Sequence, residues 1–322
     1  MSERITSYPF NAMDLSVTIG HLKFKNPVMT ASGTFGYGEE YSEFVDLNEI
    51  GAIIVKGISV KPMDGNPPPR ICETPCGMLN AIGLQNIGLK IFLKEKLPYL
   101  RKFDTKVIVN ILGNTLNEYV KLSKALDEAG VDGIELNVSC PNVKKGGIAF
   151  GSDTKILAKL VSRVRQSVKR AIVITKLSPN IPDIQKFAKT AEDAGSNAVS
   201  LINTISGMSI DIETWKPRLS HVTGGLSGPA IKPIAVRMVW EASRAVTIPV
   251  IGVGGIMNAQ DAIEFFLAGA TAIEVGTANF VNPKATTDII DGVEEYLKRK
   301  RIYDIKEVIG GLHGKSNNNP ND

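Results

Sequence analysis

The sequence predicts an α/β protein built as a (β/α)8 barrel, the TIM barrel, in which eight parallel strands alternate with helices. Three observations support this fold class: eight short apolar segments recur along the chain, amphipathic helix patterns lie between the later ones, and most of the segments end in polar or glycine residues. With 322 residues and 43% apolar residues, the chain is long enough for one large, well-buried domain. We expect that single domain over residues 1–312.

The eight predicted strands are apolar and often β-branched through most of their length, as expected when both faces of a parallel sheet are covered. They occupy residues 26–33, 52–59, 106–113, 133–140, 171–178, 198–204, 249–255 and 272–278. Active sites of parallel barrels gather at the carboxyl ends of the strands. The polar and glycine residues near these ends are therefore the first candidates for function.

Helix patterns with apolar residues at spacings of three and four follow the later strands. They occupy residues 117–130, 153–169, 183–195, 231–246 and 258–270. Residues 14–26 predict a small hairpin with a glycine turn that caps the opposite end of the barrel. Residues 60–100 are long for a strand-to-helix connection, which is typical of functional loops. A doubly wound open sheet is the competing fold, and eight repeats favour the barrel.

Charge and composition exclude several classes of protein. Lys and Arg number 37 against 33 Asp and Glu, and the charges are scattered, so nothing indicates a nucleic-acid surface. The sequence shows no secretory leader and no apolar run of about 18 residues, the length that predicts a spanning helix. Three dispersed cysteines form no disulfide framework. We therefore expect a cytoplasmic protein, with a disordered polar tail at residues 313–322.

Glycine-rich turns end the seventh and eighth predicted strands. The motifs are GVGGI, residues 252–256, and EVGTA, residues 274–278. Glycine lets backbone N–H groups approach an anion closely, and the amino end of a following helix adds a favourable potential. Because the last two strands of such barrels commonly bind phosphate, we predict a phosphate cradle here. The alternative is that these glycines only permit tight turns.

Two lysines, Lys56 and Lys176, stand late in otherwise apolar strands. A lysine there is costly to bury unless an anionic or electron-rich partner receives it. Either residue can hold a cofactor or form a Schiff base, or simply reach solvent at the rim of the barrel.

Five asparagines, Asn80, Asn110, Asn137, Asn142 and Asn203, are candidates for substrate binding. An amide offers a donor and an acceptor without charge, which suits an imide or ureide ring that presents both along its edges. A single asparagine at a strand end is more often a turn residue, but several on one rim favour a binding site.

Cys140 begins a polar loop at the carboxyl end of the fourth strand, in the stretch ELNVSCPN. A lone thiol is usually a buried structural residue, but this position suits a base or a nucleophile, with the thiolate as the active form. The three histidines lie away from the predicted strand ends. We predict no metal site, because Cys72 and Cys76 have no Cys or His neighbours to complete one.

Seven stretches together resemble the flavin-dependent dihydroorotate dehydrogenases over nearly the whole chain. They are ASGTFGYG (31–38), VKGIS (55–59), NAIGLQN (80–86), ELNVSCPN (135–142), ITKLSPN (174–180), GGLSGPAI (224–231), and the pair GVGGI and EVGTA. The resemblance implies a barrel with one FMN at the carboxyl ends of the strands. Its implied FMN-binding residues are Ser32, Lys56, Gly57, Asn110, Asn137, Lys176, Ile202, Gly228, Gly254, Gly255, Gly276 and Thr277.

The same resemblance implies the chemistry: dihydroorotate is oxidised to orotate in de novo pyrimidine biosynthesis. Cys140 matches the family's catalytic base, which takes the C5 proton while a hydride leaves C6 for FMN, and Lys56 also lies in the catalytic site. Asparagines on both sides of Cys140 would hold the ring. The implied substrate-binding residues are Lys56, Asn80, Ala81, Ile82, Gly83, Leu84, Asn137, Asn142, Asn203 and Thr204. Membrane-associated relatives use serine as the base.

Within this family, NAIGLQN and the stretch at residues 203–217 resemble the NAD-linked type. That type pairs its catalytic chain with an electron-transfer subunit carrying FAD and a [2Fe-2S] cluster, as a heterotetramer of two chains of each kind. A fumarate-linked homodimer of the same family is the nearest alternative. A flavin-free barrel aldolase using Lys56 or Lys176 is the alternative from another class. Cys72 and Cys76 depart from the family pattern.

Overall fold

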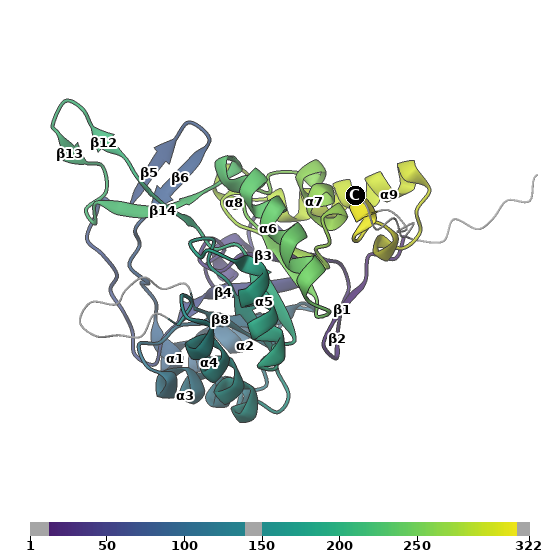
Figure 1. Cartoon of the computed structure of the whole chain (residues 1–322), viewed down its shortest axis with the longest axis horizontal. Helices are drawn as coiled ribbons and strands as arrows, with labels where there is room; N and C mark the ends of the chain where they lie inside the picture. Colours follow the sequence, from purple (N-terminus) through teal and green to yellow (C-terminus); the bar gives the residue numbers. More distant parts are fainter. Residues whose placement is uncertain (1–12, 139–149, 314–322) are drawn as a thin grey trace, which may run out of the picture.

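The structure, a computed structural model, describes residues 13–138 and 150–313 and contains a closed barrel of eight parallel strands (Figure 1). Around the barrel the strands follow the order β10-β15-β16-β3-β4-β7-β8-β9. Their bounds are Val28–Thr30 (β3), Ala52–Ile58 (β4), Lys106–Ile111 (β7), Gly133–Asn137 (β8), Ile172–Lys176 (β9), Ala198–Leu201 (β10), Val250–Val253 (β15) and Ala272–Val275 (β16). Each lies within one predicted segment, which confirms the predicted fold class.

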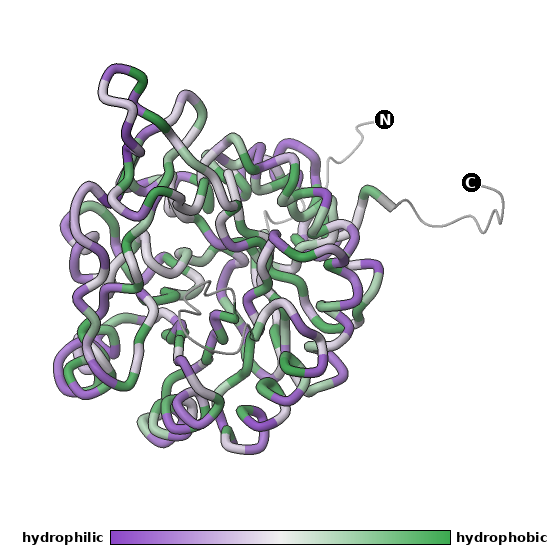
Figure 2. The backbone as a smooth tube through the Cα atoms, turned by 60° about the vertical axis from the view of Figure 1, so that its left-hand side comes forward, coloured by the Kyte–Doolittle hydropathy of each residue, from purple (hydrophilic) through white to green (hydrophobic). Residues whose placement is uncertain are grey.

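Helices surround the barrel, and the five predicted helix patterns are confirmed. The longer helices are Leu116–Glu128 (α3), Thr154–Ser167 (α4), Ile184–Asp193 (α5), Lys232–Ala245 (α6), Ala259–Leu267 (α7) and Ala285–Lys300 (α9). Four of them begin after a residue whose side chain accepts a backbone N–H of the first turn: Thr115, Asp153, Asp183 and Asn258. Green and purple segments alternate along the outer chain in Figure 2, as amphipathic helices require.

The predicted capping hairpin is present as β1 (Val17–Ile19) and β2 (Leu22–Phe24). Gly20 turns the chain between them with φ +59°. A Cβ at Gly20 would lie 3.1 Å from Ile172, the first residue of β9. The hairpin therefore packs against the amino end of the barrel, away from the predicted site.

A second, antiparallel sheet was not predicted. Its strands follow the order β11-β14-β6-β5, with bounds Ile205–Met208, Thr223–Ser227, Gly77–Asn80 and Ile71–Thr74. A two-stranded extension, β12 (Ile210–Asp211) and β13 (Lys216–Pro217), continues from it (Figure 1). The sheet joins the long loop after β4 to the connection after β10. It holds both segments beside the carboxyl ends of the barrel strands.

Short helical segments complete the described chain. They are η1 (Glu39–Tyr41), α1 (Gly88–Ile91), the π-helix η2 (Phe92–Lys96), α2 (Leu97–Leu100), η3 (Pro229–Ile231), α8 (Ala278–Val281), η4 (Ile305–Glu307) and η5 (Gly311–His313). None of the helices in the described ranges is both long and apolar enough to cross a membrane. Cys140, Asn142 and, apart from His313, the predicted tail lie outside those ranges, so the boundaries 1–312 and 313–322 stay predictions.

Candidate functional site

Two of the predicted asparagines meet at the carboxyl end of the barrel. Asn137 ends β8 and pairs in register with Lys176, the last residue of β9. The Asn203 side-chain amide donates to the Asn137 side-chain oxygen over 3.4 Å, and the Asn203 backbone N–H donates to Leu177. Just before Asn203, Ile202 follows a cis peptide bond and donates its N–H to Val253 at the end of β15. Neighbouring strand ends thus bring these predicted residues to one rim.

The second sheet brings the loop at residues 80–84 to the same side. Asn80 pairs with Gly225 of β14, and its side-chain amide donates to the Gly225 carbonyl over 3.2 Å. Thr204 packs so closely on Gly225 that a Cβ there would lie 2.0 Å from the threonine hydroxyl oxygen. Asn80 and Thr204, which are far apart in the sequence, therefore approach each other through one glycine.

The backbone of residues 81–84 is held by neighbouring asparagine and backbone groups. The Asn66 side-chain amide donates to the Ala81 carbonyl and the Asn66 backbone N–H donates to Ile82, each over 2.9 Å. Gly83 and Leu84 have φ values of +74° and +63°, and such a conformation is unusual for leucine. A backbone fixed in this way can present its N–H groups to a small ligand without paying for ordering.

Three glycine turns converge where the phosphate cradle was predicted. Gly255, after β15, has φ +75°, and a Cβ there would lie 2.8 Å from the Gly228 carbonyl oxygen and 2.9 Å from the Lys232 nitrogen at the start of α6. After β16, the Thr277 hydroxyl donates to Ser227 over 2.8 Å. We keep the name phosphate cradle for this predicted site, which consists of Gly228, Gly254, Gly255, Gly276 and Thr277. Backbone without side chains next to the amino end of α6 suits an anion.

Ser32 lies at the edge of the phosphate cradle. It follows β3 and is half-buried, and the neighbouring Ala31 donates its N–H to Val275 of β16. A Cβ at Gly276 would lie 3.4 Å from the Ala31 side chain. The first and last strands of the barrel thus bring Ala31, the neighbour of Ser32, beside Gly276.

Lys56 is a half-buried cation whose amine makes no ion pair or hydrogen bond with another described residue. Burial, and then the charge of Arg70, lower its pKa below the usual value, and Glu40 opposes them only in part. A Cβ at the adjacent Gly57 would lie 2.9 Å from the Asn110 side-chain oxygen, so this segment is close to β7. An anionic ligand at this point would relieve the cost of burying the lysine charge.

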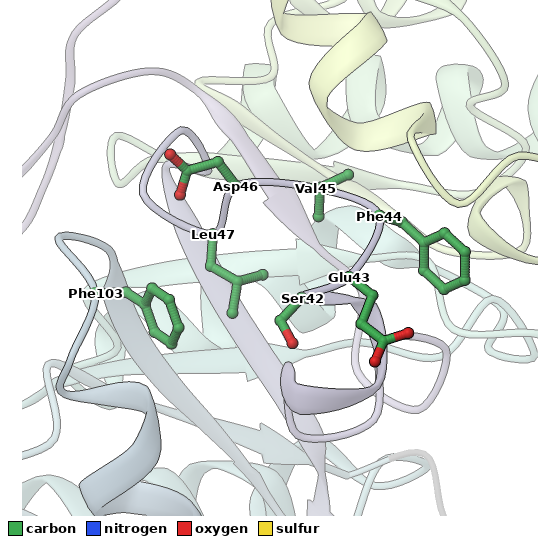
Figure 3. A pocket seen from close by; sticks show the side chains of 7 residues that line it. All are labelled: Ser42, Glu43, Phe44, Val45, Asp46, Leu47 and Phe103. Atoms are coloured by element: carbon green, nitrogen blue, oxygen red, sulfur yellow. The ribbon is translucent and has the colours of Figure 1, made fainter.

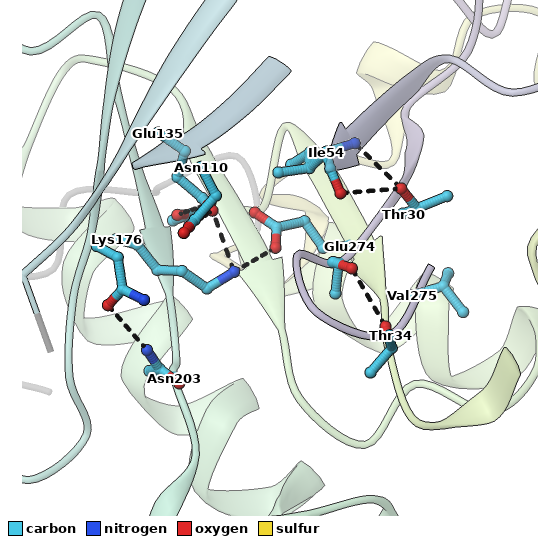
Figure 4. Close-up of polar contacts among 12 residues, drawn as sticks. Thr30, Thr34, Ile54, Asn110, Glu135, Lys176, Asn203, Glu274 and Val275 are labelled. Atoms are coloured by element: carbon cyan, nitrogen blue, oxygen red, sulfur yellow. Dashed lines mark hydrogen bonds and ion pairs between the residues drawn. The ribbon is translucent and has the colours of Figure 1, made fainter. Parts of the chain in front are cut away.

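Lys176 points into the barrel and is only 4% exposed (Figure 4). Its amine lies 2.5 Å from Glu274 of β16 and 3.4 Å from Glu135 of β8. Burial opposes the ammonium form, yet the two carboxyl groups outweigh it and raise the pKa of Lys176. The lysine is therefore a cation, and a protonated amine is not the nucleophile that a Schiff-base aldolase needs.

Sequence reasoning missed Glu135 and Glu274. Both are fully buried in strands that read GIELN and AIEV, and a glutamate inside a strand of that kind was an available signal. Asn110 and Ser200, from β7 and β10, both donate to Glu135, over 2.6 Å and 2.7 Å. A polar layer thus fills the barrel interior beneath the predicted site residues.

Other candidate features lie apart from this rim. A shallow surface hollow of about 410 Å³ is lined by residues 42–47 and Phe103 (Figure 3). These segments precede β4 and β7, so the hollow is near the amino ends of those strands. Cys72 and Cys76 are free thiols in the β5–β6 hairpin. Within residues 13–138 and 150–313, no three His, Cys, Asp or Glu side chains gather as metal ligands.

The fold and the site define a class: parallel-barrel proteins with glycine turns after the last two strands, where phosphate binding is predicted, and with lysine and amide side chains near the same rim. The chain belongs to the dihydroorotate dehydrogenase family, whose profile matches residues 14–297. This confirms the family that the sequence motifs indicated.

Individual relatives agree with the family assignment. A protein of Thermoanaerobacter sp. strain X514 is 57% identical over 93% of this chain and 99% of its own length. One of Geotalea daltonii is 58% identical over 93% of this chain and 98% of its own. Both are named dihydroorotate dehydrogenase B (NAD(+)), catalytic subunit. The crystal structure of an Eimeria tenella dihydroorotate dehydrogenase in complex with ferulenol shares the fold, with a TM-score of 0.77 at 24% identity over 94% of this chain and 89% of that one.

Proposed function

We propose that this chain is an FMN-dependent oxidoreductase that converts (S)-dihydroorotate to orotate in de novo pyrimidine biosynthesis. The observation that carries the proposal is the family match over residues 14–297, together with relatives more than half identical over nearly their whole length. The site supports the proposal, because the predicted phosphate cradle, the half-buried Lys56 and the hydrogen-bonded amides of Asn137 and Asn203 lie near one rim of the barrel.

The residues present fit an FMN. In the phosphate cradle, a Cβ at Gly255 would lie 2.8 Å from the Gly228 carbonyl oxygen and 2.9 Å from the Lys232 backbone nitrogen, so glycine is needed for this close approach of backbone segments beside the amino end of α6, where an anion is favoured. We propose that the ring and ribityl chain contact the remaining residues that the resemblance implied, namely Ser32, Lys56, Gly57, Asn110, Asn137, Lys176 and Ile202. Bound FMN would supply the acceptor for the hydride that leaves C6 of the substrate. Releasing the flavin with acid and identifying it by chromatography tests the cofactor: one FMN per chain is expected, and FAD would contradict the proposal.

The chain's own groups would bind and deprotonate the substrate. Lys56 would pair with the substrate carboxylate, which would offset the burial that lowers the lysine pKa. Asn137 and Asn203, joined by a hydrogen bond, would present amide donors and acceptors to the ring edges, with Asn142 beside them. The fixed backbone of residues 80–84 and Thr204 would orient the ring. Cys140 would then take the C5 proton as general base.

We expect the substitution Gly255→Ala to weaken FMN binding. The alanine must adopt φ +75°, and its Cβ would lie 2.7 Å from the Lys232 Cβ and 2.8 Å from the Gly228 carbonyl oxygen. The phosphate cradle must therefore shift. Such strain costs about 1–3 kcal/mol, which corresponds to roughly 5- to 150-fold in the FMN dissociation constant if the strain falls on the bound form. Flavin fluorescence titration measures it.

Gly130→Ala is the matched control for this substitution. Gly130 has nearly the same φ, +77°, but its nearest neighbour is the flexible end of Arg101 at 3.3 Å, away from the phosphate cradle. It should lower stability without changing the FMN dissociation constant. Equal FMN affinity in the two variants would contradict the placement of the phosphate.

We further propose that electrons pass from this chain to NAD through a partner subunit. The support is the name of the relatives, which specifies NAD(+) and a catalytic subunit. The partner would carry FAD and a [2Fe-2S] cluster, in a heterotetramer of two catalytic and two electron-transfer chains. A cytoplasmic location stays a prediction from the sequence.

The electron acceptor can be tested directly. We expect dihydroorotate oxidation with NAD only when the electron-transfer subunit is added, and little activity with fumarate. The measurement is the rate of orotate formation with each acceptor, with and without the second subunit. Rapid turnover with fumarate by the chain alone would support the fumarate-linked alternative.

A further inference from the structure

A cluster of three ionisable side chains lies inside the barrel, and the proposed reaction assigns a role to only one of them. We call Glu135, Lys176 and Glu274 the carboxylate–lysine cluster (Figure 4). They come from β8, β9 and β16 and are 0%, 4% and 1% exposed. Lys176 is a proposed flavin residue, whereas neither glutamate is on the list of implied cofactor residues. The question is what two buried acids do beside one buried base.

We propose that Glu135 and Glu274 share one proton and one negative charge, and that this half-protonated pair is a positioning device that keeps Lys176 charged and fixed at the base of the flavin site. The first reason is the charge count. Two ionised glutamates and one ammonium would leave a net charge of −1 in the barrel interior, and burying an uncompensated charge there is very costly. One retained proton makes the cluster neutral.

The hydrogen bonds show which glutamate is prepared to be the anion. Glu135 receives donors on both carboxyl oxygens: Ser200 over 2.7 Å and Lys176 over 3.4 Å on Oε1, and Asn110 over 2.6 Å on Oε2. From the residues that the structure describes, Glu274 receives only the Lys176 ammonium, on Oε2, over 2.5 Å. The arrangement around Glu135 therefore suits a carboxylate.

The remaining oxygen of Glu274 accounts for the proton. As a carboxylate oxygen, Glu274 Oε1 is buried and receives no hydrogen bond from any described residue. A buried acceptor without a donor is unfavourable. The Glu135 carboxyl interacts with the Glu274 carboxyl, so a protonated Glu274 could donate a hydrogen bond to it.

The pKa directions agree with this geometry. Burial, followed by the negative charge of Glu135, raises the pKa of Glu274 well above its usual value. Burial also opposes ionisation of Glu135. The charge of the Lys176 ammonium and the hydrogen bonds that Glu135 receives outweigh burial and lower the pKa of Glu135 overall. Among the described residues, the charges with the largest effect on the two glutamates are those within the cluster itself. Two carboxyl groups that influence each other in this way titrate as a pair.

The role of the shared proton follows from the position of Lys176. With a single negative counter-charge, the ammonium remains protonated in the interior, and the two glutamates hold it from two sides of the barrel. Glu135 and Glu274 would thus act through Lys176, as positioning residues, without touching substrate.

Infrared spectroscopy of the FMN-loaded chain tests the shared proton. Glutamate labelled with ¹³C at the side-chain carboxyl separates glutamate bands from flavin carbonyl bands in a labelled-minus-unlabelled difference spectrum. We expect one protonated glutamate near neutral pH in the unsubstituted protein and none in Glu274→Gln. Glu135→Gln should also show none, because Glu274 then ionises as the only counter-charge to Lys176.

Two outcomes would overturn the inference. The first is the absence of a protonated glutamate in the unsubstituted protein, a measurement that does not depend on the folding of any variant. The second is a protonated-carboxyl band that persists in Glu274→Gln. The proposal rests on the proposed function only for the flavin beside Lys176. If the chain bound no FMN, the same spectrum could be recorded on it, so failure of the cofactor assignment and failure of the shared proton are distinguishable.

A double substitution tests the positioning role. Glutamine has nearly the shape of a protonated glutamate, and in each single variant the other glutamate remains as a carboxylate. Each single variant should therefore change the unfolding equilibrium constant by less than about tenfold. Glu135→Gln combined with Glu274→Gln removes both counter-charges and should change it by at least about a hundredfold, far more than the product of the single effects. The FMN dissociation constant should follow the same pattern. If the double variant changed the unfolding equilibrium constant only by the product of the two single effects, that result would contradict a shared charge.

Discussion

The substitution Cys140→Ala is expected to lower the rate of dihydroorotate oxidation near neutral pH by about 10²- to 10⁴-fold, the usual contribution of a general base. FMN should remain bound, because the residues proposed to hold it belong to the strand ends and the phosphate cradle. The measurement is the rate of flavin reduction by dihydroorotate in a stopped-flow instrument. Unimpaired reduction in the variant would refute the assignment of Cys140 as the base.

Two further cysteine variants sharpen this test. Cys76→Ser removes an exposed thiol from the β5–β6 hairpin and should leave the rate unchanged. Cys140→Ser replaces a thiol by a hydroxyl that is much harder to deprotonate. The remaining activity of this variant should therefore keep increasing up to a higher pH than the activity of the unsubstituted enzyme does. A pH profile that does not change in Cys140→Ser would mean that another group takes the proton.

The substitution Lys176→Met is expected to have the second large effect, on both stability and the flavin. It leaves Glu135 and Glu274 inside the barrel without their counter-ion. Removing one partner of a buried ion pair typically costs about 3–5 kcal/mol of the free energy of unfolding. The variant should also bind FMN more weakly or be reduced more slowly, because no cation remains to stabilise negative charge on the reduced ring. Chemical denaturation and flavin titration measure the two effects.

The stability loss in Lys176→Met should depend on pH. In the unsubstituted folded protein the pKa of Glu135 is lowered. Ionisation of Glu135 therefore contributes stability at pH values above the pKa that this glutamate has in the unfolded chain, ordinarily 4.5. Without Lys176, burial alone would raise the pKa of that group in the folded protein. The variant would then lose stability as the pH rises from the unfolded-state pKa towards the raised value in the folded protein, so the deficit should grow as the pH increases above 4.5. A deficit independent of pH would contradict the electrostatic cause.

Lys189→Met is the control for charge removal as such. Lys189 lies on the surface of α5, 52% exposed, where it pairs with Glu192 and Asp193. Solvent screens such pairs, so this variant should unfold nearly as the unsubstituted protein does and bind FMN unchanged. A large effect at Lys189 would indicate that overall charge governs stability.

The barrel was predictable because its signal is repeated. Strands such as β4 and β9 are short apolar segments bounded by polar residues, and helices such as α4 begin at a recognisable capping residue, Asp153. Each repeat is weak alone, but eight in order favour a closed parallel sheet. The capping hairpin was predictable from a local signal, since a glycine turn separates two short strands.

The second sheet could not be predicted from local pattern. β14 reads TGGLS and has little intrinsic preference for a strand. Its pairing with β6 joins residues about 145 apart in the sequence, and only the folded barrel brings them together. The loop at residues 60–100 was expected to be functional, but its hairpin depends on this long-range pairing.

The candidate site was predicted in part. Strand-end position identified Lys56, Lys176, Asn110, Asn137 and Asn203, because carboxyl ends of parallel strands share one edge. Which strand interiors face each other across the barrel was not available from the sequence. That is why Glu135 and Glu274, which hold Lys176, were missed, although each glutamate interrupts an apolar strand. The assignments of Cys140 and Asn142 stay predictions, since both lie outside the described residues.

The most direct test of the proposed function is an anaerobic absorbance titration of the purified chain with dihydroorotate. We predict flavin bands in the starting spectrum that bleach on addition of substrate, with about one orotate formed per flavin in the absence of any acceptor. This result would establish the cofactor, the substrate and the first half of the reaction together. A chain that stays colourless after FMN is added, or whose flavin does not bleach with dihydroorotate, would contradict the proposed function.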